Sequence, residues 1–141
     1  SDNSFGVGLI EVDYDETLSH YAEWSRLTVN EIAKLNKKNK RSYLKVHSKI
    51  KVPFRNISPD VFEERRQEYH KAIQEDFFNN FQVDKVLVRN IKKGETIWKI
   101  CNDIYSIPFW LLATYNSEKD IYSIPIGELI TIPVISPVVS N

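Results

Sequence analysis

The stretch KKGETIWKI, residues 92–100, decides the fold because its pattern occurs twice in the chain. YDETLSHYA, residues 14–22, contains the same Glu-Thr pair followed by an apolar residue, at an offset of 79 positions. The hydroxyl groups of Thr17 and Thr96 are suited to accept a hydrogen bond from a free backbone N–H at the start of a helix. The recurrence therefore predicts two polar turns that each lead into a helix.

Two further segments match between the two halves of the chain. IAKLN (32–36) corresponds to LATYN (112–116), and IKVP (50–53) corresponds to ITIP (130–133). Both pairs have an offset of 80 positions, so the second copy contains one additional residue, which we place near Tyr105. Three matching segments in the same order indicate an internal repeat.

Each copy has the pattern of a strand, two helices and a second strand. Thr28 and Glu31 have the spacing at which each side chain satisfies the other residue's backbone N–H at a helix start. Pro108 suits the first turn of the corresponding helix, where its missing N–H costs nothing. Runs rich in Val, Leu and Ile flank these helices and favour strands. The predicted strands are 9–12 and 49–52 in the first copy and 86–91 and 129–132 in the second.

The helices of each copy also have recognisable faces and ends. Ile97, Ile100 and Ile104 have the spacing of one helix face, and Leu18 begins a less regular counterpart in the first copy. The asparagines of the two matching segments stand where the second helix of each copy is expected to stop. The predicted fold class is therefore α+β, with two units that each have the order strand, helix, helix, strand.

Residues 58–82, between the copies, are predicted to form one long amphipathic helix. Ser58 can cap this helix and Pro59 suits its first position. Five apolar residues at spacings of seven and four form a stripe on one face: Phe62, Tyr69, Ile73, Phe77 and Phe81. The stripe predicts packing against one or both copies, and the alternative is a docking face for a protein partner.

We expect the chain to have four parts. The first module covers 7–54, a helical connector covers 55–84, the second module covers 85–135, and a tail covers 136–141. The chain starts at Ser1 and contains no Met, which suggests a piece of a longer protein or a processed form.

Charge and composition argue against several classes of protein. The 19 basic residues balance 19 acidic residues, so no overall field favours nucleic acid or an anionic membrane surface. No apolar run has the length of a membrane span. The basic run KLNKKNKR (34–41) is interpreted as a solvated loop, and the alternatives are contact with anionic envelope polymers or with nucleic acid. The lack of stacking aromatic residues beyond Tyr43 argues against nucleic acid. We therefore expect no nucleic-acid partner and no membrane insertion.

Two sets of reactive side chains give little support for a metal or catalytic site. Four residues of the first turn could suggest a cation site, namely Asp13, Asp15, Glu16 and His20. They lack the spacing of a known metal-binding motif, so a solvated turn is favoured. Glu95 is the counterpart of Glu16 in a separate copy, which does not match the carboxylate pair of a glycosidase. His70 lacks a nearby nucleophile and Cys101 occupies an expected core position, so a Cys-His mechanism has no support. We expect no catalytic residue, metal or cofactor.

Three segments of the second copy together form a recognisable motif: VRNIKKGETIWKI (88–100), LLATYN (111–116) and IGELITIP (126–133). In these segments the second copy resembles the LysM module, a family of peptidoglycan- and chitin-binding domains. The first copy has the same frame in a divergent form. The resemblance implies two βααβ modules, each with two helices on one side of a two-stranded antiparallel sheet. It also implies binding of glycans that contain N-acetylglucosamine.

The resemblance places the sugar in a shallow groove between the first strand-to-helix loop and the loop before the last strand. The residues implied in the second copy are Gly94, Glu95, Thr96, Ile97, Ile124, Pro125 and Ile126. Weaker candidates in the first copy are Asp15, Glu16, Thr17, Leu18 and Leu44.

The first copy departs from the family at two positions where glycine is usual. Asp15 and His47 stand there, whereas the second copy keeps Gly94 and Gly127. Glycine adopts a positive φ at little cost, and other residues do so less readily. We therefore expect the second copy to bind sugar better than the first.

The functional expectation is a non-catalytic region that attaches a larger protein to peptidoglycan in a bacterial cell envelope, in the periplasm or outside the cell. A catalytic domain such as a cell-wall hydrolase, outside this chain, is compatible with this expectation. The alternative is a protein-interaction scaffold of the envelope that keeps the LysM fold without glycan affinity, with a protein partner at the 58–82 helix.

Overall fold

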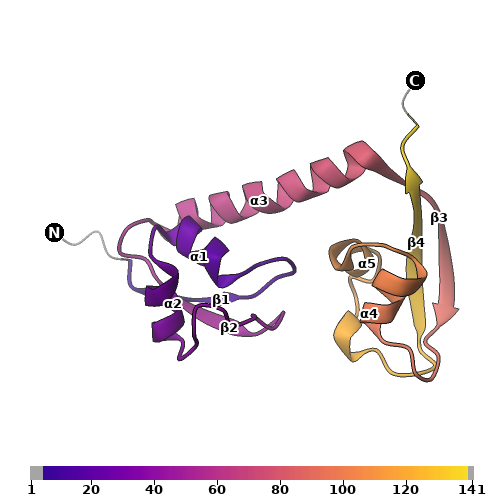
Figure 1. Ribbon diagram of the computed structural model, residues 1–141, viewed down its shortest axis with the longest axis horizontal. Helices are drawn as coiled ribbons and strands as arrows, with labels where there is room; N and C mark the ends of the chain where they lie inside the picture. The colour runs from indigo at the N-terminus through magenta and orange to yellow at the C-terminus, as the bar shows by residue number, and fades with distance from the viewer. Residues whose placement is uncertain (1–4, 140–141) are drawn as a thin grey trace. The chain divides into compact units, whose positions relative to one another are not determined.

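The computed structural model describes residues 5–139 and contains two compact units, Ser1–Ile73 and Gln74–Asn141. The boundary between them falls inside the long helix α3 (Pro59–Asn80), so each part of this helix belongs to a different unit. In each unit, short helical segments accompany a two-stranded sheet (Figure 1). The predicted α+β class is confirmed.

The first unit begins with the expected strand, helix, helix and strand. These are β1 (Val7–Glu11), α1 (Leu18–Ser25), α2 (Val29–Leu35) and β2 (Lys49–Pro53). The two strands are antiparallel, with Ile10 opposite Ile50. Both helices start as predicted: Thr17 accepts a hydrogen bond from the His20 backbone, and Thr28 and Glu31 form the reciprocal cap.

The first part of α3 belongs to the core of the first unit. Phe62 is fully buried, and its ring lies edge-on to Trp24 at 5.9 Å and to Phe54 at 5.4 Å between centroids. Tyr69, also on the apolar stripe, packs against the same core. The prediction that the helix packs on a copy is therefore confirmed for the first unit, whose core would lack a large aromatic side chain without α3.

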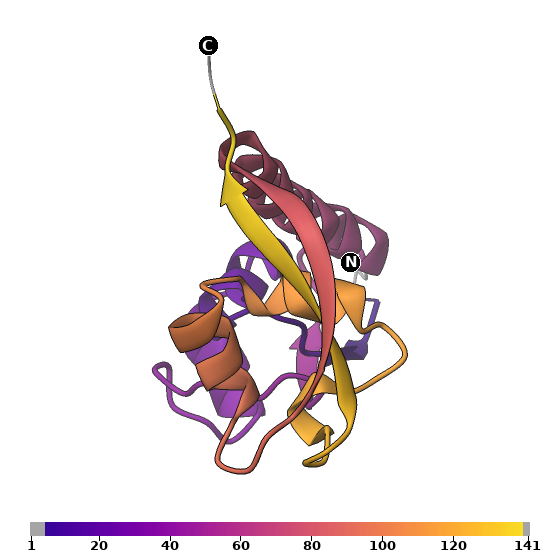
Figure 2. The same cartoon turned by 90° about the vertical axis from the view of Figure 1, so that its right-hand side faces the viewer.

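The second unit repeats the order with longer strands. Its elements are β3 (Phe81–Asn90), α4 (Ile97–Lys99), the π-helix η1 (Ile100–Ile104), α5 (Phe109–Tyr115), the 3₁₀ turn η2 (Ile121–Ser123) and β4 (Leu129–Pro137). The strands form a twisted antiparallel ribbon (Figure 2), with Leu87 opposite Ile132 and an irregularity between Val83 and Lys85.

The long helix ends two residues earlier than predicted, and the following strand begins earlier. Residues 81–83 belong to β3 because β4 continues to Pro137 and offers them backbone partners, which sequence periodicity could not reveal. The first two residues of the predicted tail, 136–137, therefore belong to β4, and residues 140–141 lie outside the described part of the chain. The limits 7–54, 55–84 and 85–135 remain a prediction.

The additional residue of the second copy lies in a π-helix. The backbone N–H of Tyr105 donates to the carbonyl of Ile100 at 3.1 Å, the wider turn that accommodates one extra residue. The predicted regular face is wrong at its end, because the wider turn leaves Ile104 49% exposed while Ile100 is fully buried. The change in offset from 79 to 80 positions thus has a structural cause.

One asparagine in each unit joins the second helix to the last strand. The amide nitrogen of Asn116 donates to the carbonyls of Leu112 and Thr131, and its amide oxygen accepts from the Thr131 backbone at 2.9 Å. Asn36 makes the same three contacts in the first unit with Ile32 and Lys51. The prediction that both helices stop at these asparagines is confirmed.

The end of α3 packs within the second unit. The ring of Phe77 lies edge-on to Trp110 at 5.3 Å and stacks on Phe81 at 5.2 Å. Cys101 is buried in the second unit's interior, as predicted, and burial raises the pKa of its thiol to about 12. Among the described residues, no helix combines the length and apolar character needed to cross a membrane.

Candidate functional site

The loops of both units keep the same left-handed backbone at two positions. Asp15 has a φ of 61° where Gly94 has 85°, and His47 has a φ of 73° where Gly127 has 89°. A Cβ atom added at either glycine would meet no atom within 4 Å. The first unit therefore keeps the loop conformation without glycine. The left-handed backbone costs about 1 kcal/mol at each of the two residues.

A glutamate closes the first turn in each unit. The Glu16 carboxylate accepts a hydrogen bond from the Asp13 backbone at 2.9 Å, and the Glu95 carboxylate accepts one from the Lys92 backbone at 2.8 Å. Glu95 also pairs with Arg89 of β3. The Glu-Thr pair that recurs in the sequence thus has two structural roles: the glutamate holds the turn, and the threonine begins the helix.

The first unit has a groove between its first strand-to-helix loop and the loop that leads to β2. It has a volume of about 310 Å³ and is lined by Glu16, Thr17, Leu18, Ser19, Lys40, Arg41, Ser42, Tyr43 and Leu44. Four of the five weaker candidates line this groove, and Asp15 is not among the lining residues. The side chains of Glu16 and Leu18 are buried, whereas Tyr43 is 98% exposed. Buried residues thus form the floor, and polar and aromatic groups form the rim.

In the second unit, both predicted loops start from the same end of the β3–β4 sheet. The N–H of Gly127 donates to the Ile91 carbonyl at 2.8 Å, and the Asn90 side chain donates to the Gly127 carbonyl at 2.6 Å. Gly94, Thr96, Pro125 and Ile126 are exposed, and Glu95, Ile97 and Ile124 are half-buried. These residues are accessible to a ligand, and their role in binding remains a prediction.

The Glu16 carboxylate forms a buried network that the sequence did not reveal. Arg66 of α3 donates to it from Nε at 2.6 Å and from Nη2 at 2.8 Å, and the Tyr21 hydroxyl donates at 2.5 Å. His70 Nε2 lies 2.6 Å from the same carboxylate. The Glu16 side chain has no exposed surface, so the prediction of a solvated turn is wrong for this residue, because α3 covers it.

This network determines the charge of Glu16. Burial by itself would raise the pKa of the Glu16 carboxyl, but hydrogen bonds from His70, Arg66 and Tyr21 outweigh burial and lower the pKa to about 2. Burial and the bond to Glu16 also raise the pKa of the Tyr21 hydroxyl. The network is therefore an ionised carboxylate held by a guanidinium at neutral pH.

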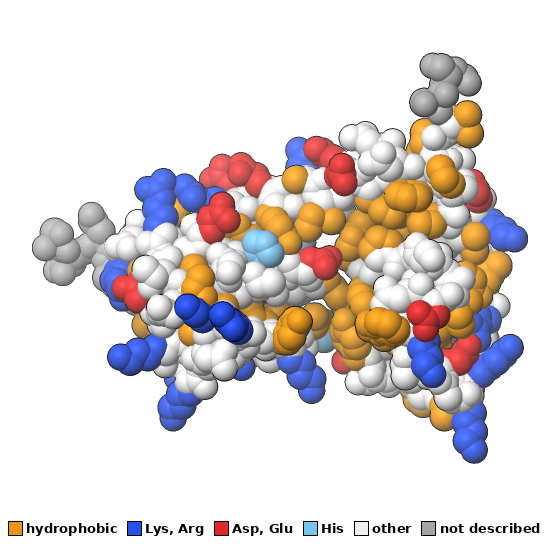
Figure 3. Space-filling model, in the orientation of Figure 1, with side chains coloured by type: hydrophobic (Ala, Val, Ile, Leu, Met, Phe, Trp, Pro, Cys, Tyr) orange, Lys and Arg blue, Asp and Glu red, His pale blue; other side chains and the backbone are white. Residues whose placement is uncertain are grey.

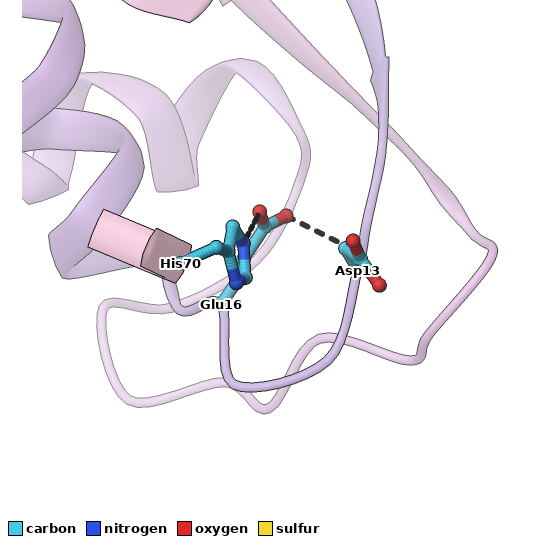
Figure 4. Close-up of side chains that lie close together, drawn as sticks. All are labelled: Asp13, Glu16 and His70. Atoms are coloured by element: carbon cyan, nitrogen blue, oxygen red, sulfur yellow. Dashed lines mark hydrogen bonds and ion pairs between the residues drawn. The ribbon is translucent and has the colours of Figure 1, made fainter. Parts of the chain in front are cut away.

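Asp13, Glu16 and His70 lie close enough to suggest a metal site, with potential ligand atoms within 4.8 Å of one another (Figure 4). Arg66, however, already contacts both oxygens of Glu16 with a positive charge. The Asp13 carboxylate accepts a hydrogen bond from the Tyr14 backbone at 2.7 Å. The arrangement fits an ion-pair network, and a divalent cation would have to displace the guanidinium.

Two more hydrogen bonds fasten α3 to the first turn. Arg66 Nη2 donates to the Glu11 carbonyl, and the Tyr69 hydroxyl donates to the Asp15 carbonyl, both at 2.6 Å. The sequence did contain a signal for this contact, since Arg66 and His70 are four residues apart on the helix and share a face. Their partner could be identified only from the tertiary structure.

A second hollow of about 560 Å³ lies between α1 and α3 in the first unit. Its lining is rich in glutamate and includes Glu23, Trp24, Val61, Glu64, Arg65, Glu68 and Tyr69. None of the predicted site residues lines it.

Comparison with known proteins identifies the repeated segments. The family model of the LysM domain matches twice, at residues 10–53 and 90–133, which together make up more than half of the chain. No curated protein sequence matches the chain. A solved structure similar to this chain is the crystal structure of the Bacillus cereus spore cortex-lytic enzyme SleL, with 17% identity and a TM-score of 0.34. The similarity covers 92% of this chain and 23% of that one, so the chain spans about a quarter of its length.

Proposed function

Because the chain belongs to the LysM domain family and contains two such domains, we propose that it is a carbohydrate-binding region that attaches a larger protein to cell-wall peptidoglycan. LysM domains generally bind peptidoglycan or chitin, and they are not catalytic. The ligand in this proposal is a glycan that contains N-acetylglucosamine. The proposed location is the bacterial cell envelope, in the periplasm or outside the cell.

The observation that carries the proposal is the groove of the first unit. It lies between the two loops that the family resemblance implied, and it brings together residues from 16–19 and 40–44. A groove that combines the accessible apolar side chains of Tyr43 and Leu44 with hydroxyl groups suits a sugar, because the apolar surface accepts the acetamido methyl group while backbone and hydroxyl groups form hydrogen bonds.

The equivalent surface of the second unit is proposed as a second site. Its residues are Gly94, Glu95, Thr96 and Ile97 in one loop and Ile124, Pro125 and Ile126 in the other. The loop backbones of the two units match in their left-handed positions, which supports an equivalent surface. Two domains in one chain increase the avidity for a polymer when both can engage it.

A binding assay on insoluble, purified peptidoglycan tests the proposal, with chitin oligomers as soluble competitors. We expect the full chain to sediment with peptidoglycan and chitin oligomers to release it. Tyr43→Ala in the first unit and Gly94→Val in the second should each reduce the bound fraction. Thr96→Ala, in the same loop as Gly94, should also reduce the bound fraction.

The control for this assay is Leu9→Ala. It removes an exposed apolar side chain of β1 that belongs to neither proposed binding surface. Circular dichroism checks that each variant is folded. Absence of binding by the folded wild-type chain, or binding that none of the loop variants changes, would contradict the proposal.

The alternative, an interaction scaffold without glycan affinity, has less support from the described contacts. Its main argument is an exposed aromatic stripe on α3, but Phe62 is buried in the first unit and Phe77 contacts Trp110 within the second. Phe78 is the large aromatic side chain of α3 that stays substantially exposed, at 46%. Light scattering distinguishes the two functions, since a docking face on α3 predicts self-association.

A further inference from the structure

The loops that lead to the last strand differ in charge between the two units. Residues 37–41 (KKNKR) contain four basic residues and no acidic one, whereas the corresponding residues 117–121 (SEKDI) contain two acidic residues and one basic. Lys40 corresponds to Asp120 at the offset of 80 positions. The duplicated loop has thus reversed its charge at the position that borders the groove of the first unit.

The basic side chains at this groove are available to a ligand. Lys40 and Arg41 both line the groove and are exposed, and neither forms an ion pair with another residue among positions 5–139. Several Lys and Arg side chains gather over α2 and the segment that follows it (Figure 3). The one acidic residue of the lining, Glu16, is already paired with Arg66.

In the second unit the corresponding acidic residue has a local structural role. The Asp120 carboxylate accepts a hydrogen bond from the Tyr122 backbone at 3.1 Å at the start of η2. Lys119, beside it, donates to the Leu129 carbonyl and lies 3.7 Å from Glu128. The basic group of this loop therefore has a partner in its own unit, in contrast to Lys40 and Arg41.

We infer that the groove of the first unit prefers a carboxylate-bearing glycan, held by Lys40 and Arg41, while the second unit has no such preference. The inference rests on the proposed function of the groove. Arginine and lysine bind carboxylates through charge-assisted hydrogen bonds, and arginine can do so through two bonds at once. In peptidoglycan, the lactyl group of muramic acid or the peptide attached to it supplies carboxylates, whereas chitin is neutral.

The physical setting determines how large this preference is. Both cations are exposed, so each contact contributes modestly and is weakened by salt. The combined effect of the two contacts is expected to be about three- to tenfold in affinity at low ionic strength. The exposed ring of Tyr43 adds an apolar surface on the same rim for a sugar ring.

Isothermal titration of the full chain with three soluble tetrasaccharides tests the inference. The first alternates N-acetylglucosamine with N-acetylmuramic acid and has free lactyl carboxylates, the second is the same molecule with these groups methyl-esterified, and the third is a chitin tetramer. We expect the first to bind most tightly. Lys40→Gln/Arg41→Gln should weaken it about three- to tenfold and leave the affinity for the other two unchanged.

The control variant is Lys34→Gln/Lys85→Gln, which removes the same number of charges from exposed positions outside the proposed binding loops. Equal weakening by both double variants would show a bulk charge effect and overturn the inference. Equal affinity for the free and esterified tetrasaccharides would also overturn it while the proposed function stands. If no tetrasaccharide binds the folded chain, the proposed function fails together with the inference.

Discussion

Arg66 donates two hydrogen bonds to the carboxylate of Glu16, from Nε at 2.6 Å and from Nη2 at 2.8 Å, across fifty positions of the sequence. The Glu16 side chain is fully buried and that of Arg66 is 15% exposed. This pair joins the turn that precedes α1 to the long helix α3. It therefore couples a loop that borders the proposed groove to the helix that completes the core of the first unit.

Replacement of Glu16 by Gln should destabilise the first unit by about 2–3 kcal/mol. The change removes the buried counter-charge of Arg66, which keeps its ion pair with the partly exposed Glu63, and the cost is reduced by the solvent that still reaches the guanidinium. Urea unfolding followed by circular dichroism measures the effect. Glu11→Gln, which removes an exposed pair with Lys49, is the control and should change stability much less. Equal effects of the two substitutions would refute a special role for the buried pair.

Stability should fall in acid partly through Glu16. Its pKa is 4.5 when unfolded and about 2 when folded, so the unfolded chain binds a proton first as the pH falls. The contribution is fully present above pH 4.5 and is lost progressively between about pH 4.5 and 2. It amounts to about 2–3 kcal/mol after allowance for solvent screening.

The Glu16→Gln variant separates this contribution from that of other carboxylates. Hydrogen bonds or ion pairs also lower the pKa values of Glu11, Glu31 and Glu95, so the wild-type curve includes their titration. The difference in unfolding free energy between wild type and variant should therefore shrink as the pH falls through this range. A difference that stays constant from pH 6 to pH 3 would contradict the low pKa of Glu16.

Phe62→Ala should cost about 3–5 kcal/mol, because it removes a fully buried ring that contacts Trp24 and Phe54. The matched control is Phe78→Ala on the same helix, where the side chain is 46% exposed. Thermal and urea unfolding of both variants provide the comparison. If Phe62→Ala were no more destabilising than Phe78→Ala, α3 would not be part of the first unit's core.

The left-handed backbone before the last strand predicts opposite effects on stability when glycine is removed from the second unit and when it is introduced into the first. Gly127→Ala should destabilise the second unit by about 1 kcal/mol, since its φ of 89° is strained for a side chain although no atom lies within 4 Å of the added Cβ. His47→Gly, at the equivalent position with a φ of 73°, should stabilise the first unit by about 0.5 kcal/mol. Chemical unfolding measures both changes. Two shifts of the same sign would show that backbone strain does not dominate at these positions.

Much of the local structure follows from short-range patterns. The helix starts at Thr17, Thr28 and Thr96, and the ends at Asn36 and Asn116, agree with the predictions because caps depend on neighbouring residues. The repeat offset also predicts an inserted residue in the second copy. Its form, a π-helix that turns Ile104 outward, depends on how the wider turn is accommodated against the core.

The groove could be predicted less completely than the fold. Glu16, Thr17, Leu18 and Leu44 follow from the family resemblance and do line one groove. From the sequence alone, the basic residues of the same groove are interpreted as part of a solvated loop. A run of charged residues in a sequence does not show whether its side chains line a groove. The position of Tyr43 at the same groove could not be predicted either, because the sequence does not show which residues line a groove.

The sequence by itself determined that this protein contains two copies of one unit, where the first helix of each copy begins and the second helix ends, and which family they belong to, because these features repeat within short windows. Only the tertiary structure decided that Glu16 is buried under α3, that Phe62 completes the first core, and that Lys40 and Arg41 border a groove. Burial and charge pairing depend on residues far apart in the chain. Their identity is settled only when the elements pack together.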